Sequence, residues 1–230
     1  SLGVAEFIKN ENREILFIAH DIYFGLLCHY VPKQRGVCGC YIAHSTGKLF
    51  KEKFRLPVEK LIHNGISKNF FLFGYISEFM KNHLLIAYKV KEQQLVPIIN
   101  TLLSIDKNLL DQKLSHPSTQ ELRGIDKDRK IIFSFGRCSH QKGYDILIDG
   151  FLKSGQFNKY CLVLLAPTDI ADKKYLDLIE FKLNKLPERS YRFIRQFMSP
   201  LPLLASKRTK IVAFASRFEC APVAALEAIE

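Results

Sequence analysis

Short, mostly apolar runs that alternate with helical stretches constrain the fold of this chain more than any other feature. Each run has four to seven residues, the length of a strand buried in a parallel sheet. The runs lie at residues 15–19, 40–43, 70–76, 95–99, 130–135, 160–166, 192–197 and 211–215, and helical patterns lie at 22–30, 77–89, 148–152, 173–185 and 201–207. This alternation predicts an α/β fold with parallel sheets.

A polar segment divides the chain. Residues 104–129 include the sequence His116-Pro117-Ser118 and most of a charged run at 126–130. Such a composition between two strand-and-helix regions is typical of a linker. We therefore expect an amino-terminal domain at residues 1–103 and a carboxyl-terminal domain at residues 130–230.

The composition bounds the class of protein. The 230 residues are 47% hydrophobic and 25% charged, as in a soluble globular protein, and no apolar run is long enough to span a bilayer. No signal peptide is evident, and the six cysteines are scattered, several of them in apolar strands, which favours reduced thiols. Cys28-His29 and Cys38-x-Cys40 do not have the spacing of a common structural zinc site. These features predict a cytoplasmic protein without a metal centre.

The formal net charge of +11 is high for this length. Such a charge favours nucleic acid, an anionic membrane surface or phosphorylated substrates as partners. The lysines and arginines are spread along the chain without a dense basic block, so most of them are expected on solvated faces. Nucleic acid is therefore not expected as a partner. Peripheral contact with anionic lipid at the inner face of the membrane is the second reading, and it suits an enzyme with a lipid-linked acceptor.

Two histidines follow neighbouring strands in the first half. His20 comes after the run at 15–19, and His44 comes after the run at 40–43. A helix between two such strands makes a βαβ unit, so both imidazoles are expected at the carboxyl edge of the sheet, where open α/β sheets bind ligands. An imidazole there can hydrogen-bond a sugar hydroxyl or a phosphate oxygen. Structural packing is the alternative role for either histidine.

Two cations lie in a turn of the second half. Gly136-Arg137 and Lys142-Gly143 stand between the run at 130–135 and the helix that follows. Cations at a strand-to-helix turn can neutralise a pyrophosphate leaving group as its charge develops. The alternative is a surface loop with two ordinary basic side chains.

Two carboxylates flank the start of the last helix. The sequence from Glu219 to Glu227 begins in a loop after the run at 211–215, with Pro222 at the first helical position and Val223 after it. A helix amino terminus attracts phosphate, and a mostly helical segment would place the two glutamates about 12 Å apart. A nucleotide-sugar is a similarly long ligand. An ordinary helix with two solvated glutamates is the alternative.

These stretches together resemble motifs of the family 4 glycosyltransferases. Glu219-Cys-Ala-Pro-Val-Ala-Ala-Leu-Glu227 is similar to the Glu-x7-Glu signature of that family, and Gly136-Arg137 with Lys142-Gly143 is similar to its Gly-Arg…Lys-Gly segment. Ile42-Ala43-His44, Tyr75-Ile-Ser-Glu and Gln94-Leu-Val-Pro-Ile-Ile-Asn100 resemble segments of the family's first domain.

The resemblance implies two Rossmann-like parallel-sheet domains, the GT-B architecture. It implies a retaining transfer of a hexose from a nucleotide diphosphate sugar to a saccharide or lipid-linked acceptor, in cell-surface polysaccharide or glycoconjugate synthesis. The donor is a substrate, and neither a cofactor nor a metal ion is implied. The implied roles are diphosphate binding by Arg137 and Lys142, sugar hydroxyls for Glu219, ribose for Glu227, and the acceptor side for His20 and His44. Gly136, Pro222 and Val223 belong to the implied donor site.

The chain also departs from the family pattern. Thr101 replaces the glycine after Asn100, Cys220-Ala221 replaces the common Gly-Phe, and Pro167 follows Ala166 where a glycine is usual. The resemblance covers residues 14–230 and implies that both domains are incomplete. A scaffold that lost activity is therefore one alternative to an active enzyme, and a basic nucleic-acid-binding protein is a weaker one.

Overall fold

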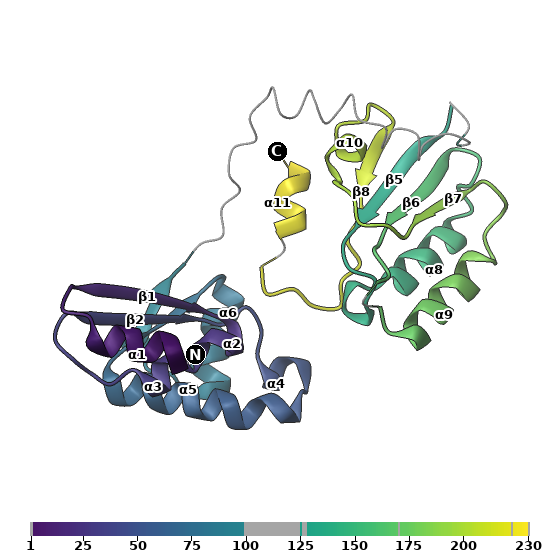
Figure 1. The fold of residues 1–230 in the computed structure, drawn as a ribbon. Helices are drawn as coiled ribbons and strands as arrows, with labels where there is room; N and C mark the ends of the chain where they lie inside the picture. Colours follow the sequence, from purple (N-terminus) through teal and green to yellow (C-terminus); the bar gives the residue numbers. More distant parts are fainter. Residues whose placement is uncertain (1, 99–124, 126–127, 170, 222, 230) are drawn as a thin grey trace. The chain divides into compact units, whose positions relative to one another are not determined.

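The computed structural model describes residues 2–98, 125, 128–169, 171–221 and 223–229. The chain divides into two compact units, Ser1–Thr101 and Leu102–Glu230. Each unit is built on a four-stranded parallel sheet (Figure 1). The two parallel sheets confirm the α/β fold class with two Rossmann-like domains. Most of the predicted linker, residues 104–129, lies outside the described residues.

The first unit has the strand order β1-β2-β3-β4. Helices from the connections pack on the sheet, and the tightest helix contact is between α3 and α5, where a Cβ atom on Gly65 would overlap the carbonyl group of Cys28. The elements are α1 (Leu2–Asn10), β1 (Ile15–His20), α2 (Asp21–Gly25), α3 (Leu27–Tyr30), β2 (Val37–Ile42), α4 (Gly47–Phe50), η1 (Lys53–Arg55), α5 (Leu56–Asn69), β3 (Leu72–Tyr75), α6 (Glu78–Tyr88), η2 (Glu92–Gln94) and β4 (Leu95–Pro97).

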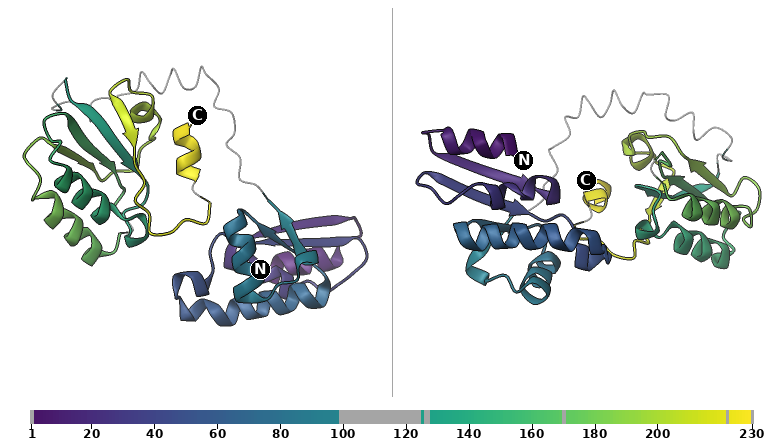
Figure 2. Two further views of the ribbon diagram at one scale, coloured as in Figure 1. Left: turned by 180° about the vertical axis from the view of Figure 1, so that it is seen from behind. Right: turned by 60° about the horizontal axis from the view of Figure 1, so that its bottom comes forward.

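The second unit has the strand order β7-β6-β5-β8. Helices α8 and α9 lie side by side on one face of this sheet (Figure 1, Figure 2), where Lys182 of α9 forms an ion pair with Asp149 of α8. The elements are β5 (Lys130–Phe135), η4 (His140–Lys142), α8 (Tyr144–Ser154), β6 (Tyr160–Leu165), α9 (Lys173–Leu183), β7 (Tyr191–Ile194), α10 (Leu201–Leu204), β8 (Thr209–Val212) and α11 (Val223–Ile229).

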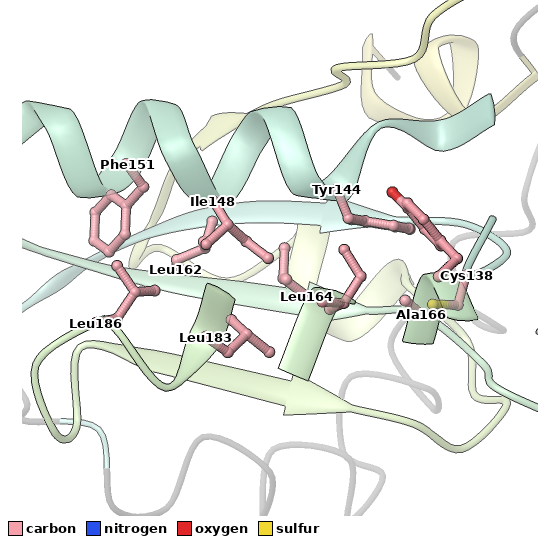
Figure 3. Close-up of a cluster of buried hydrophobic side chains, with 11 residues drawn as sticks. Cys138, Tyr144, Ile148, Phe151, Leu162, Leu164, Ala166, Leu183 and Leu186 are labelled. Carbon is pink, nitrogen blue, oxygen red and sulfur yellow. The ribbon is translucent and has the colours of Figure 1, made fainter. Parts of the chain in front are cut away.

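The core of the second unit explains its continuous apolar strands. On one face, Tyr144, Ile148 and Phe151 of α8 point onto Leu162 and Leu164 of β6 (Figure 3). On the other face, a separate cluster contains alternate residues of β5 and β6 together with α10; its members include Ile131, Phe133, Val163 and Leu203. Because both faces are covered, every residue of β6 after Tyr160 is buried.

Several predicted boundaries differ from the observed ones. The strand predicted at 211–215 is Thr209–Val212, and Ile211 is 43% exposed, because within the described sheet β8 pairs only with β5. The helix predicted at 22–30 is two short helices, and the strand predicted at 192–197 ends at Ile194. The N-cap predicted at Ser77 is observed, since its hydroxyl accepts a hydrogen bond from the Met80 amide. None of the described helices is long and apolar enough to cross a membrane.

Candidate functional site

Two loops meet at the carboxyl edge of the second sheet. Residues 136–143 follow β5, and residues 213–221 follow β8, its neighbour in the sheet. The carboxyl ends of neighbouring parallel strands lie at the same edge, so the two loops are brought together by the fold itself. The backbone amide of Ala213 donates a hydrogen bond to the carbonyl of Phe133 (2.8 Å) as the second loop begins.

The two loops are fastened to one another through their backbones. The amide of Arg217 donates to the carbonyl of Gln141 (2.8 Å), and the Gln141 side chain donates to the carbonyl of Phe218 (3.2 Å). Gly143 has a φ of +66°, and a Cβ atom at this position would overlap the carbonyl oxygen of Ala215. Only glycine combines this backbone conformation with so close an approach. The approach aligns the residues that flank Gly143 with those that follow Ala215.

The alignment produces an ion pair between two of the predicted site residues. Lys142 Nζ donates to Glu219 Oε1 at 2.6 Å, although the two residues are 77 positions apart in the sequence. The side chains are 17% and 23% exposed, so the pair is partly shielded but open to a ligand. Gly136 lies beside it, with a φ of +139°; a Cβ atom there would be 3.5 Å from Lys142 Cε. The structure therefore brings Gly136, Lys142 and Glu219 together.

A second ion pair, which the sequence analysis did not identify, supports the first. Arg217 binds the carboxylate of Asp145 through both terminal nitrogens (2.9 and 2.7 Å) and also donates to the carbonyl of His140 (2.6 Å). The Tyr175 hydroxyl donates to the same carboxylate (2.8 Å). Hydrogen bonding from Arg217, partly opposed by burial, lowers the pKa of Asp145 to about 2. The sequence could have indicated this second pair through its position, because Asp145 lies two residues after Gly143 and Arg217 lies two residues before Glu219.

A cavity of about 870 Å³ opens beside Arg137. Its walls are mainly apolar and come from the ends of β5 and β6 and the starts of α10 and α11; they include Phe135, Gly136, Leu165, Pro167, Asp169, Met198 and Val223. This volume is within the range of small-molecule sites. Arg137 is exposed and makes no ion pair with another described residue, so its guanidinium is available to an anion at the rim.

The side chains of two predicted donor-site residues are not among the described ones. Pro222 lies outside the described residues, and Glu227 is described only as part of the α11 backbone. The role predicted for Glu227 therefore stays a prediction. Val223 begins α11 and lines the cavity together with Arg137.

In the first unit, the two predicted histidines form a pair. His20 ends β1 and His44 follows β2, and His20 Nδ1 lies 2.9 Å from His44 Nε2. The rings are stacked, with centroids 5.2 Å apart and planes inclined by 18°. One nitrogen must donate and the other accept, so a single proton lies between the two rings. Burial, followed by the charge of His20, lowers the pKa of His44, and Asp21 opposes this effect.

None of the six cysteines, all of which the structure describes, forms a disulfide. Burial raises the pKa of Cys28 to about 12, which makes it unreactive at neutral pH. Within the described ranges, no three His, Cys, Asp or Glu side chains are grouped so that they could hold a metal ion.

No protein-family model and no curated protein sequence matches the chain. Among solved structures, it is similar to a UDP-forming trehalose-phosphate synthase from Burkholderia vietnamiensis, with 11% sequence identity and a TM-score of 0.76. It is also similar to a sucrose-phosphate synthase from Thermosynechococcus elongatus (16%, TM-score 0.73). A third match is a trehalose-phosphate synthase from Burkholderia xenovorans in complex with glucose-6-phosphate (13%, TM-score 0.75).

These matches cover nearly the whole chain but little more than half of the other proteins. The covered share is 99%, 98% and 99% of this chain, and 59%, 56% and 58% of the respective structures. Identities this low establish the fold alone. The GT-B type of fold implied by the resemblance is therefore confirmed, and the assignment to family 4 remains a prediction.

Proposed function

We propose that this chain belongs to a glycosyltransferase that moves a hexose from a nucleotide diphosphate sugar to an acceptor hydroxyl with retention of configuration. The observation that carries the proposal is the Lys142–Glu219 pair at 2.6 Å, which lies next to Gly136. Gly136 and Arg137 in turn line a cavity of about 870 Å³. One extended ligand would use all three features. The cations suit its diphosphate, the carboxylate suits its sugar hydroxyls, and the apolar cavity suits its nucleoside. The similarity of fold to enzymes named for UDP-forming synthesis supports the same reading.

The cations have a direct role in this reaction. As the bond between the anomeric carbon and the diphosphate oxygen breaks, negative charge accumulates on the diphosphate. In this proposal Lys142 and Arg137 stabilise that charge, and preorganised groups of this kind supply large rate enhancements. The acceptor oxygen forms the new bond to the anomeric carbon, and the proton of the acceptor hydroxyl leaves with the diphosphate product.

Glu219 holds hydroxyls of the transferred sugar in this proposal. Its carboxylate is fixed by Lys142, so it is already oriented when the sugar arrives. A fixed carboxylate also stabilises the positive character that develops at the anomeric carbon. Glu227 is assigned to the ribose, with Pro222 and Val223 at the start of the same helix. The His20–His44 pair is assigned to the acceptor side, where the ring nitrogens outside the pair, His20 Nε2 and His44 Nδ1, can hydrogen-bond a sugar hydroxyl.

The finer parts of the proposal come from the sequence. We assign a saccharide or lipid-linked acceptor and a place in cell-surface polysaccharide or glycoconjugate synthesis. The high positive charge of the chain supports peripheral contact with anionic lipid at the inner face of the membrane. The reduced state of the cysteines supports a cytoplasmic location. Diphosphate stabilisation by lysine and arginine makes a divalent metal unnecessary, and nucleic acid is not assigned as a partner.

The experiment combines donor binding with transfer. The protein is screened by thermal shift against UDP-, GDP- and ADP-sugars, and the donor that binds is used in a transfer assay. We expect Lys142→Ala and Glu219→Ala to lower kcat about 100-fold or more while the circular dichroism spectrum is unchanged. Lys153→Ala is the matched control, because Lys153 is exposed near the far end of α8. Wild-type turnover in both site variants, or the absence of binding to any nucleotide-sugar, would refute the assignment.

A further inference from the structure

We propose that Arg55 is a positioning residue that holds the His20–His44 pair in its hydrogen-bonded geometry. The inference rests on the proposed function in so far as the pair acts during transfer. Its structural part, that one guanidinium sets the geometry of the two imidazoles, can be tested independently of activity.

Arg55 joins the residues that directly follow the two histidines. Its Nη2 donates to Asp21 Oδ1 (2.9 Å), and Asp21 is the next residue after His20. Its Nη1 donates to the hydroxyl of Ser45 (2.9 Å) and its Nη2 to the carbonyl of Ser45 (3.2 Å), and Ser45 is the next residue after His44. One planar side chain therefore fixes the two segments that carry the histidines relative to each other.

The backbone at Asp21 needs such support. Asp21 has a φ of +55°, in the left-handed region that residues with a side chain seldom occupy. Its Oδ1 atom accepts hydrogen bonds from the amide of Ile22 (2.8 Å) and from Arg55, and both contacts hold the turn in this conformation. The turn begins directly after His20, the last residue of β1, so its conformation sets the direction in which the chain leaves that histidine.

Arg55 is itself held by surrounding carboxylates. Its side chain is 10% exposed, and its Nη1 and Nε atoms lie 3.3 Å from Glu52 and 3.6 Å from Glu59. Glu59 also accepts hydrogen bonds from the Gly47 amide (2.7 Å) and the Tyr88 hydroxyl (2.6 Å). The guanidinium is thus anchored between α5 and the loop after β2. A lysine could not reproduce this arrangement, because a single ammonium group lacks the planar fork that reaches two segments at once.

The hydrogen bond between the two rings gives a spectroscopic readout that a merely stabilising residue would not change. One of the two nitrogens, His20 Nδ1 or His44 Nε2, carries the proton and the other accepts it, so the bond holds each ring in one tautomer. The nitrogen chemical shifts of a histidine ring report its tautomer. If the rings separate, the hydrogen bond is lost and the tautomers are no longer fixed by it.

The test uses the whole chain and long-range proton–nitrogen NMR spectra of the histidine rings between pH 4 and 8. We compare wild type, Arg55→Lys, Arg55→Gln and Ser45→Ala, with Arg35→Lys as the control on an exposed arginine in the loop before β2. We expect the nitrogen shifts of the hydrogen-bonded pair in wild type and Arg35→Lys, and the loss of the hydrogen bond in both Arg55 variants. We also expect kcat about 10- to 100-fold lower in Arg55→Lys, with KM for the donor within about threefold of wild type, since small misplacement of reacting groups has effects of this size.

The outcomes distinguish the positioning role of Arg55 from the proposed function of the chain. A His20–His44 hydrogen bond that persists in Arg55→Lys overturns the positioning role. Loss of this hydrogen bond in the Arg55 variants of a chain whose wild type shows no transfer supports the positioning role and refutes the proposed function. Should Arg55→Gln not fold, Ser45→Ala decides the question: it removes the contact between Arg55 and the Ser45 hydroxyl, and an unchanged hydrogen bond between the histidines there overturns the inference.

Discussion

His63 should make the first unit sensitive to mild acid. The side chain lies on α5 between two aromatic rings, with centroid distances of 4.7 Å to Phe73 and 4.8 Å to Tyr88. Burial, with a smaller effect of the Lys48 charge, lowers the pKa of His63 to about 4 from the ordinary value of 6.5. A shift of this size means that protonating His63 costs roughly 3 kcal/mol more in the folded chain than in the unfolded chain.

The direction in which pH changes the free energy of unfolding follows from the uptake of protons by the unfolded chain. Between pH 6.5 and about 4, the unfolded chain binds a proton at His63 and the folded chain does not. The free energy of unfolding therefore falls as the pH is lowered through this window, and His63 has no effect above it. At pH 4.5 the expected loss from this residue is about 2.5 kcal/mol relative to pH 7.5.

The assay compares urea unfolding of wild type and His63→Gln at pH 7.5 and pH 4.5, followed by far-ultraviolet circular dichroism. Glutamine cannot titrate, and the lowered pKa values of His44 and His83 are common to both proteins, so their effects cancel in the comparison. Wild type should lose about 2.5 kcal/mol more than the variant on acidification. Equal losses in the two proteins, or an NMR titration that places His63 near 6.5, would show that the reasoning is wrong.

Two further predictions concern the loops and the polar contacts. Gly143→Ala should weaken donor binding at least tenfold by calorimetry, because its Cβ would overlap the carbonyl oxygen of Ala215 and separate the loops. Gly150→Ala, on an open face of α8, is the control and should bind normally. Tyr88→Phe should lower the free energy of unfolding by about 1–3 kcal/mol, since the buried Glu59 loses a hydrogen bond of 2.6 Å; an unchanged urea midpoint would contradict this.

The parts of the fold that are local in sequence could be predicted from it. The strand at Lys130–Phe135 has the predicted bounds, because an apolar run covered on both faces ends sharply at Gly136. The N-cap at Ser77 is equally local. The bounds of β8 were not predictable in the same way, because that strand is only partly covered and its pattern does not show where pairing with β5 stops.

The candidate site was predictable only where a motif marked it. Lys142 and Glu219 were found because each lies in a recognisable motif, and the structure shows that they touch. Asp145, Arg217 and Arg55 were missed, because their importance lies in pairings across 72, 34 and 10 positions of the sequence. The local pattern around Arg55 does not distinguish an arginine that joins two segments from a solvated side chain.

The backbone contact between Gly143 and the carbonyl of Ala215 has a consequence for how ligands bind. Two loops that touch through their main chains restrict each other, so the ammonium and the carboxylate they carry are held together by the protein itself. A donor entering such a site orders few additional dihedral angles, and little conformational entropy is lost on binding. Affinity in this half of the protein should therefore depend on the chemistry of the ligand more than on any folding of the loops around it.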